Sequence, residues 1–139
     1  MDLTMNIMLD KRASEPNKAH EEDAGYDLRA AKGYIIYPGH SRVMETGVHI
    51  ELPKGTVAYV KNRSSLFSKD LMVDGTIDPG YTGPIKVTMF NNGTKAALIK
   101  YGDKIAQLTF HETLSPKFKI VNQFKETDRG DGGFGSSGR

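Results

Sequence analysis

The chain has 139 residues, enough for one compact domain with an ordinary hydrophobic core. Its 19 basic and 17 acidic residues give a net charge of only +2, with no block of like charges, which argues against bulk attraction to nucleic acid or to an acidic membrane surface. Cysteine is absent, which excludes disulfides and cysteine nucleophiles, and the lack of a signal peptide or long apolar span leads us to expect a soluble, cytoplasmic protein.

Short segments of alternating apolar and polar residues run along the chain, and Gly, Pro and Asn separate them about every 8 to 12 residues, which is typical of an all-β sandwich or barrel. In the segment 85–90, Ile85, Val87 and Met89 fall on one face of a strand, so we expect that face to lie on the core. One short helix is predicted at 64–70, with Ser64 or Ser65 as its N-cap. The predicted strands are 5–9, 34–37, 43–52, 56–62, 85–90, 104–111 and 117–122.

Two early segments carry polar groups that a purely structural strand does not need. Asp27 and Arg29 lie inside the otherwise apolar segment 24–31, where they either serve a site or form an ordinary surface ion pair. Arg63-Ser64-Ser65 directly follows an apolar strand, so a guanidinium and two hydroxyls stand beside a helix start. That arrangement suits a phosphate group, although a simple helix cap explains the serines equally well.

Two later segments carry further candidates. The segment 74–81 predicts a hairpin whose turn, Asp78-Pro79-Gly80, brings Asp78 and Tyr81 near each other, although turns also favour aspartate for local reasons. In the strand that follows Gly102, residues Ala106 and Leu108 share one face. Gln107 therefore points to the opposite face, towards either a ligand or solvent.

The tail, residues 129–139, contains five glycines and one large apolar residue, Phe134. Glycine lets backbone N–H groups turn inward as an anion-binding nest, and Arg129, Ser136 and Ser137 add donors suited to phosphate. Two interpretations are open. The tail is either a lid that stacks its aromatic ring on a base and wraps a nucleotide's phosphates, or a disordered Gly/Ser linker.

In order and spacing, these five segments resemble the five motifs of the trimeric deoxyuridine triphosphatases, the dUTPases. The resemblance spans nearly the whole chain and implies a jelly-roll-like β-barrel assembled as a homotrimer with sites shared between subunits. It also implies a catalytic domain at 1–128 and a flexible Gly-rich strap at 129–139 that closes over the active site. The motifs match at 24–31, 63–65, 75–83, 102–108 and 129–138.

The activity implied by this resemblance is hydrolysis of dUTP to dUMP and pyrophosphate by attack of water on the α-phosphorus, with Mg²⁺ bridging the triphosphate. This reaction limits uracil incorporation into DNA and supplies dUMP for dTMP synthesis. Asp78 is the implied catalytic residue, which activates the water, and Asp27 serves the metal through water or else buttresses the site. The implied substrate-binding residues are Arg63, Ser64, Ser65, Gly75, Thr76, Ile77, Tyr81, Lys86, Gln107, Arg129, Phe134, Gly135, Ser136 and Ser137.

The chain departs from the usual family pattern at Asn62 and Ser65, where proline and glycine are common, and at Pro79-Gly80, where an acidic residue usually precedes the tyrosine. The sister family of dCTP deaminases carries a similar Arg-Ser-Ser motif, but Thr88 occupies the position of its catalytic glutamate. A second alternative is a β-barrel that binds nucleotides or a partner protein without hydrolysing anything.

Overall fold

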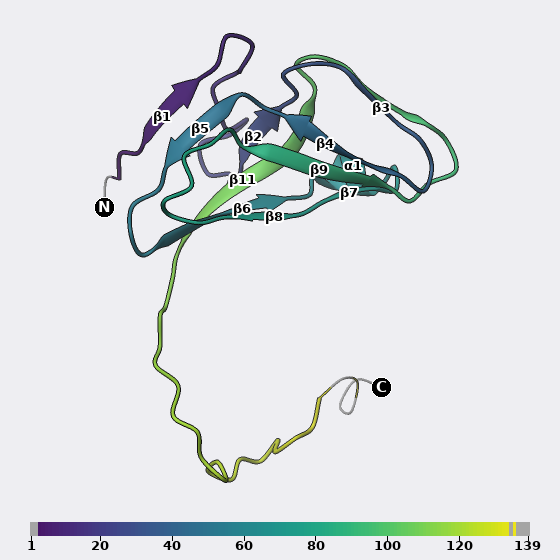
Figure 1. Ribbon diagram of the computed structural model, residues 1–139. Coiled ribbons are helices and arrows are strands. Elements are labelled where there is room, and N and C mark those ends of the chain that lie inside the picture. The colour runs from purple at the N-terminus through teal and green to yellow at the C-terminus, as the bar shows by residue number, and fades with distance from the viewer. Residues whose placement is uncertain (1–2, 134, 136–139) are drawn as a thin grey trace.

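The computed structural model describes residues 3–133 and 135 and shows an almost entirely β protein with one short helix (Figure 1). The helix is α1 (Ser64–Phe67). The all-β prediction is confirmed. The strands are β1 (Asn6–Leu9), β2 (Tyr26–Arg29), β3 (Tyr34–Ile36), β4 (Ser41–Glu45), β5 (Val48–Glu51), β6 (Thr56–Lys61), β7 (Leu71–Val73), β8 (Gly75–Ile77), β9 (Lys86–Asn91), β10 (Ala97–Ile99) and β11 (Lys104–Glu112).

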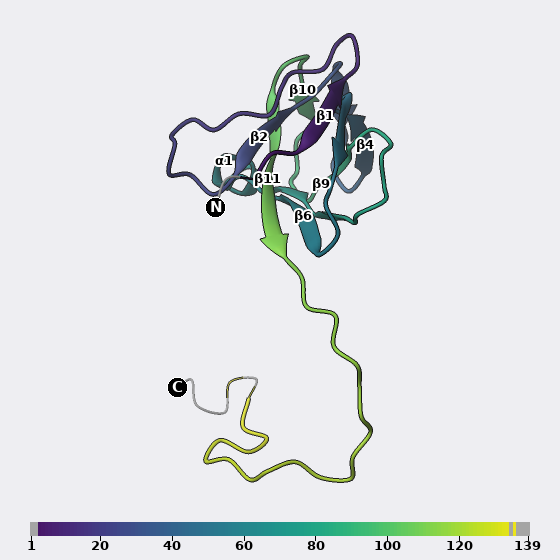
Figure 2. The same ribbon diagram turned by 90° about the vertical axis from the view of Figure 1, so that its left-hand side faces the viewer.

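All strand pairs in these sheets are antiparallel. A four-stranded sheet has the order β2-β11-β6-β8, a three-stranded sheet has the order β4-β9-β7, and β1-β5 and β10-β3 form two smaller pairs. The strands wrap around one hydrophobic core, and the long strand β11 runs through the body before the chain leaves it (Figure 2). Fully buried core side chains come from six strands and the β9 entry: Leu28, Ile36, Met44, Val48, Ile85, Val87, Met89, Ile105 and Leu108.

Strand β9 shows how local sequence positions a core face. Val87 and Met89 are buried, as is Ile85 just before the strand, whereas Lys86 and Phe90 between and after them are exposed. A strand turns successive side chains to opposite faces, so this period of two places one face on the core and leaves the other free. The predicted core face of this strand is confirmed.

The predicted strand at 43–52 is wrong, because this region forms two strands in different sheets. Gly47 separates β4 from β5 with a φ of +70°, a conformation that residues with a Cβ rarely adopt. The turn is also crowded, since a Cβ at Gly47 would lie 2.9 Å from the Cβ of Ala13. Thr46 then donates from Oγ1 to the carbonyl of Ile85 at 2.7 Å, which ties the turn to the start of β9.

The helix also differs from its prediction. It ends at Phe67 rather than at residue 70, and its N-cap is Arg63, which makes no side-chain capping hydrogen bond. The predicted cap at Ser64 or Ser65 is therefore wrong, and both serines lie inside the helix with exposed side chains. Their hydroxyls are not consumed by capping and stay available to a ligand.

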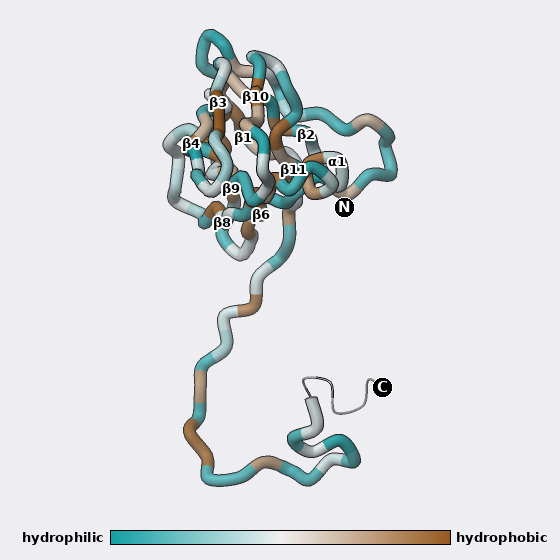
Figure 3. The backbone as a smooth tube through the Cα atoms, turned by 90° about the vertical axis from the view of Figure 1, so that its right-hand side faces the viewer, coloured by the Kyte–Doolittle hydropathy of each residue, from teal (hydrophilic) through white to brown (hydrophobic). Residues whose placement is uncertain are grey.

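After β11 the chain leaves the body as an extended segment, residues 113–128, which we call the C-terminal arm (Figures 1 and 3). The predicted strand at 117–122 is wrong for the single chain, since no strand forms in this described segment. Apolar side chains nevertheless recur along the arm, and Phe118 and Ile120 are 92% and 97% exposed. Such exposure on an extended segment indicates a surface that needs a partner outside its own chain.

Within the described part of the chain, no helix is long and apolar enough to cross a membrane.

Candidate active site

The antiparallel strands β7 and β9 form a hairpin whose connection, residues 74–85, carries the first group of predicted site residues. The hairpin predicted within 74–81 is wrong in its pairing, because β8 in this connection pairs with β6 instead. The turn in this connection is closed by a hydrogen bond from the Tyr81 N–H to the Asp78 carbonyl at 3.3 Å, and Gly80 has a φ of +93°. Proline at the second position and glycine with positive φ at the third are the signature of a type II turn. The prediction that this turn brings Asp78 and Tyr81 near each other is confirmed.

These two residues share a small pocket of about 290 Å³. Both are exposed, so the carboxylate and the aromatic ring can reach a ligand. The Tyr81 hydroxyl donates to the Pro84 carbonyl at 2.7 Å, which fixes the ring across the loop. The lining residues are Thr76, Ile77, Asp78, Tyr81, Ile85 and Lys86, five of them predicted from the sequence. Gly75 starts β8 and is paired with Val60.

Gly83 provides a test of how tightly this ring is held. A Cβ at Gly83 would lie 2.7 Å from the Tyr81 hydroxyl oxygen and 2.8 Å from its Cζ, so Gly83→Ala must push the ring aside. Tyr81 is 47% exposed, so the ring can swing outward at little cost in stability. We expect a melting temperature within about 3 °C of the wild type, measured by calorimetry, and a several-fold rise in KM for the nucleotide that binds this pocket.

The matched control is Gly33→Ala, because a Cβ there would lie 3.4 Å from the Ile99 carbonyl oxygen and the residue is far from the hairpin in sequence. It should leave KM unchanged. An unchanged KM in Gly83→Ala as well would show that Tyr81 does not form a wall of the site.

A second group of predicted residues meets where β2, β11 and the start of α1 approach one another. The Asp27 carboxylate is 9% exposed and lies 3.3 Å from the Lys104 Nζ and 3.7 Å from the Arg63 Nε. Buried charges are normally paired, and here one carboxylate serves two cations. Lys104 was not predicted as a site residue, although its position inside the segment 102–108 was a usable signal.

Arg63 also lines a pocket of about 480 Å³ that is rich in cations. Arg29 is held there by donating from Nη1 to the Gly102 carbonyl at 2.8 Å. Several cations around one pocket create a positive field suited to a phosphate chain. Its polar and charged lining comprises Arg29, Arg63, Ser65, Lys69, Asp103 and Lys104, of which Arg63 and Ser65 were predicted. Ser64 is exposed beside this pocket at the first position of α1 but does not line it.

Gln107 lies opposite Asp27 in the pairing of β11 with β2 and is half-buried, while its neighbours Ala106 and Leu108 are fully buried. The prediction that it points away from that core face is confirmed. A Cβ at Gly25 would come within 2.8 Å of the Gln107 Oε1. The glycine at residue 25 is thus required by the side chain of Gln107, which links the segments 24–31 and 102–108.

The hairpin pocket and the cationic pocket are separate within one chain. In the β6–β8 pair, Ile77 lies opposite Ala58 and Gly75 opposite Val60. Asp78 therefore lies near the start of β6, whereas Arg63 follows its end. Six residues of strand span about 20 Å, which exceeds the distance from the α- to the γ-phosphorus of a nucleotide. The two pockets have no lining residue in common.

The tail is described at residues 129–133 and 135. Arg129 donates from Nε to the Gly132 carbonyl, and the Gly130 N–H donates to the Thr127 hydroxyl at 3.0 Å. Gly130 and Gly135 have φ values of +56° and +93°. The hydrogen bonds of these described residues stay within the segment 127–132. The predicted site residues Phe134, Ser136 and Ser137 lie outside the described residues.

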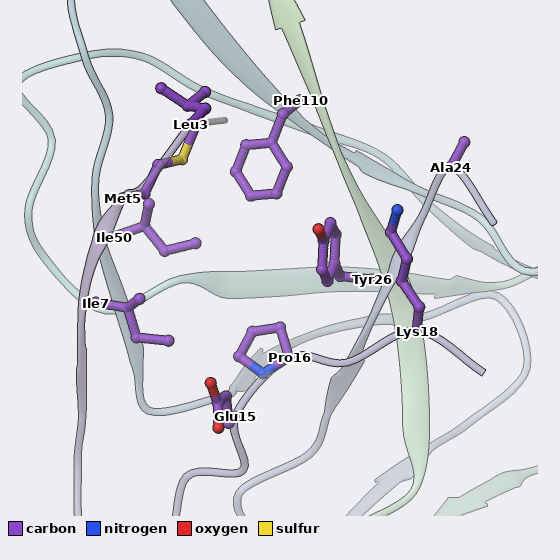
Figure 4. Close-up of a pocket in the computed structure, with 10 residues that line it drawn as sticks. All are labelled: Leu3, Met5, Ile7, Glu15, Pro16, Lys18, Ala24, Tyr26, Ile50 and Phe110. Carbon is purple, nitrogen blue, oxygen red and sulfur yellow. The ribbon is translucent and has the colours of Figure 1, made fainter. Parts of the chain in front are cut away.

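An apolar cavity of about 430 Å³ lies elsewhere, between β1, β5, β11 and the segment 15–26 (Figure 4). Tyr26 and Phe110 meet edge to face at its wall, with ring centroids 5.7 Å apart. None of the predicted site residues lines it. Its remaining lining residues are Leu3, Met5, Ile7, Glu15, Pro16, Lys18, Ala24 and Ile50.

Among the described residues, no group of three or more His, Asp or Glu side chains could hold a metal ion by itself. Mg²⁺ does not require such a group, since it commonly uses one or two carboxylates together with water and substrate phosphates. Asp27 is a suitable carboxylate beside the cationic pocket. Because both of its oxygens already face cations, it fits a magnesium ion best through an intervening water.

One further titratable side chain near the hairpin, His49, was not predicted from the sequence. His49 on β5 contacts the Thr82 carbonyl at 2.8 Å and the Asp10 carboxylate at 3.0 Å. No pattern in the sequence indicates this contact, because Thr82 lies 33 residues from His49.

Comparison with known proteins identifies relatives along nearly the whole chain. The family model described as dUTPase matches residues 11–138. A deoxyuridine 5′-triphosphate nucleotidohydrolase of Corynebacterium glutamicum is 41% identical over 96% of this chain and 93% of its own length. A protein of the same name from Clostridium tetani is 39% identical and covers 99% of both chains.

Solved structures agree. A variant of the Staphylococcus bacteriophage 80alpha dUTPase, solved with dUpNHpp, superposes with a TM-score of 0.91 at 29% identity, over 98% of this chain and 99% of its own. A variant of the dUTPase of phage phi11 of S. aureus, described with a structural Mg(II) ion, gives a TM-score of 0.83 at 27% identity over 89% and 100%. The jelly-roll-like fold predicted from the sequence is confirmed by these matches, and the chain belongs to the dUTPase family.

Proposed function

We propose that this protein hydrolyses dUTP to dUMP and pyrophosphate by attack of a water molecule on the α-phosphorus. Family membership and the names of the curated relatives support the overall reaction. The observation that carries the proposal is the shared pocket of Asp78 and Tyr81, which places a carboxylate and an aromatic wall on one tight turn. We place the reaction in the cytoplasm, because a highly charged triphosphate cannot cross an apolar membrane unaided.

The hairpin pocket binds the deoxynucleoside in this proposal. Asp78 accepts a proton from the attacking water and meets the sugar 3′-hydroxyl. Tyr81 lies flat against the deoxyribose and leaves no room for a ribose 2′-hydroxyl. Backbone groups of the hairpin, including those of Gly75, Thr76 and Ile77, pair with the uracil edge, and Lys86 adds a cation at the pocket's rim.

The cationic half-site binds the triphosphate. Arg63, Ser64, Ser65 and Gln107 donate to phosphate oxygens, and Lys104 strengthens the positive field. When bound, Mg²⁺ neutralises charge on the triphosphate, and Asp27 holds it through water. Phosphoryl transfer depends chiefly on positioning and charge stabilisation, so these groups act by being fixed in place before the substrate arrives.

A complete site needs more than one chain, which supports a homotrimer with sites shared between subunits. The hairpin of one subunit and the cationic pocket of another form the two halves, because one chain holds them about 20 Å apart. Strands β4, β7 and β9 also expose Val43, Met72 and Phe90. Met72 and Phe90 are paired across β7 and β9, so a contiguous apolar face is left for another copy.

The C-terminal arm supports the same assembly. Its exposed apolar residues cannot reach a core in their own chain, whereas the apolar cavity in Figure 4 lies beside β1, whose outer edge pairs with no strand among the described residues. When the arm of a neighbouring subunit packs on this cavity and on the free edge of β1, the apolar residues of the arm and those lining the cavity are both buried. Beyond the arm, the strap at 129–139 closes over the neighbour's site, with Phe134 stacking on uracil while Arg129, Gly135, Ser136 and Ser137 approach the phosphates.

The test of the proposed function is pyrophosphate release from dUTP, dTTP, dCTP and UTP, each with and without magnesium. We expect release from dUTP with magnesium and at least about 100-fold lower kcat/KM for the other three nucleotides. Ammonia from dCTP would instead identify a deaminase. Binding of dUTP without any turnover would identify a nucleotide-binding protein that is not a hydrolase.

A further inference from the structure

The imidazole of His49 joins three parts of the molecule that are far apart in the sequence. His49 lies on β5 with its side chain 19% exposed. Its Nδ1 is 2.8 Å from the Thr82 carbonyl oxygen, in the loop between Tyr81 and Pro84. Its Nε2 is 3.0 Å from the Asp10 carboxylate oxygen, in the segment after β1.

The chemistry of these two partners fixes the protonation state. A backbone carbonyl and a carboxylate both accept hydrogen bonds and cannot donate. A neutral imidazole donates from one nitrogen only, so its second contact would bring two acceptors together. The imidazolium donates from both nitrogens, so only the protonated ring satisfies Thr82 and Asp10 at once.

The electrostatic surroundings agree with this geometry. The Thr82 carbonyl raises the pKa of His49 above its ordinary 6.5, and Asp10 raises it further, while desolvation lowers it in part. Other titratable groups on the elements that meet His49 are Glu51 on β5, whose Oε1 accepts from Asn6 at 3.1 Å, and Asp78, Tyr81 and Lys86 on the hairpin. Because the folded-state pKa is raised, the tether is complete below pH 6.5 and is lost as the pH rises through that higher value.

His49 holds a part of the loop between Tyr81 and Ile85 that the other hydrogen bonds of this loop do not reach. The Ile85 N–H donates to the Val48 carbonyl at 2.8 Å, and the Ile85 carbonyl accepts from Thr46 at 2.7 Å. Both contacts fix the end of the loop. Among the described residues, the hydrogen bond from His49 is the one that fixes Thr82, the residue next to Tyr81.

We propose that His49 is a positioning residue for the deoxynucleoside pocket, whose protonated ring holds the Thr82 carbonyl and thereby keeps Tyr81 against the sugar. This inference rests on the proposed function, since Tyr81 matters to the reaction only where a deoxynucleotide occupies the pocket. Loss of a proton from His49 leaves one N–H donor for two acceptors, so the hold on the Thr82 carbonyl weakens. The wall formed by Tyr81 then loosens. Affinity for dUTP and discrimination against UTP then decrease together.

Two uncharged substitutions of His49 each preserve one of its two hydrogen bonds. The amide nitrogen of Asn can occupy the place of Nδ1 and donate to Thr82, whereas that of Gln can occupy the place of Nε2 and donate to Asp10. We expect His49→Gln to raise KM for dUTP about tenfold, with a smaller change in kcat, and to lower the dUTP-to-UTP ratio of kcat/KM. Below pH 6.5, His49→Asn should keep KM for dUTP and the dUTP-to-UTP ratio of kcat/KM near their wild-type values.

The pH profile adds a readout that a purely structural role would not produce. In the wild type, KM for dUTP should rise as the pH increases through the His49 pKa, and this step should be absent in His49→Asn. Equal KM and equal discrimination in His49→Gln and His49→Asn would overturn the positioning role, as would a pH step that persists in His49→Asn.

A second measurement is independent of turnover. In an NMR titration of the free protein, the ring resonances of Tyr81 should shift together with the His49 imidazole in the wild type and stay constant in His49→Asn. Tyr81 resonances that ignore the titration of His49 would overturn the inference. A wild-type protein that releases no pyrophosphate from dUTP would overturn the proposed function alone, and the titration would still decide whether His49 positions Tyr81.

Discussion

Asp78→Asn is expected to lower kcat for dUTP by about 10²- to 10⁴-fold, the usual contribution of a positioned general base. The amide keeps the size of the carboxylate and can still bond the sugar hydroxyl, but it cannot accept a proton from water. Binding of dUpNHpp should therefore stay within about fivefold of the wild type, measured by calorimetric titration. Asp78 is exposed, and the turn is closed by its backbone carbonyl rather than its side chain, so the fold should not change.

The matched control is Asp74→Asn, which removes the same charge one residue before β8 on the same hairpin. Asp74 is exposed and does not line the pocket. Its substitution should leave kcat within about twofold. Equal losses in both variants would mean that the hairpin contributes negative charge rather than a base, and undiminished kcat in Asp78→Asn would remove the proposed role of Asp78.

The hairpin half of the site could be predicted from the sequence because its geometry is local. Proline followed by glycine specifies a type II turn, and these two residues between Asp78 and Tyr81 leave the chain little other choice. The core face of β9 could be predicted for the same reason, since its apolar and polar residues alternate within a short stretch of chain. Fold class followed from the spacing of turns, which needs no knowledge of which strands pair.

The cationic half was only partly predictable, because its charges come from segments distant in sequence. Asp27 is 77 residues from Lys104 and 36 from Arg63, and their contacts exist only once β2 and β11 are paired. The prediction of the helix N-cap was wrong for a related reason. Ser64 and Ser65 have the right residue type, but the chain enters the helix at Arg63, whose extended backbone follows the end of β6.

The errors in strand prediction also have physical causes. Alternation in 117–122 marks a segment with apolar residues to bury, but a strand also needs a partner for its backbone, and among the described residues this segment pairs with none. The segment 43–52 has continuous strand character, yet Gly47 turns it from one sheet to another. β7 and β10 have three residues each, too few for any period to identify.

Ending the chain at Asp128 is expected to reduce kcat/KM for dUTP by at least about 100-fold while leaving the protein folded and the proposed trimer assembled. The described residues beyond Asp128 form hydrogen bonds only with one another and with Thr127, and none belongs to the hydrophobic core. Their removal should shift the melting temperature by less than about 2 °C. In the proposed function the strap closes on the ligand and so contributes to positioning, and small errors of position are costly in phosphoryl transfer.

A second truncation, ending at Glu112, separates the strap from the C-terminal arm. It removes the exposed Phe118 and Ile120, which we propose pack on a neighbouring subunit, so we expect the proposed trimer to dissociate, measured by sedimentation. The chain ending at Asp128 keeps these residues and should sediment as the full chain does. Because the two half-sites lie far apart in one chain, loss of the trimer should abolish turnover even though Asp78, Arg63 and their pockets are intact. Undiminished turnover in the shorter chain would show that one subunit suffices, and undiminished turnover at Asp128 would show that the strap does not close the site.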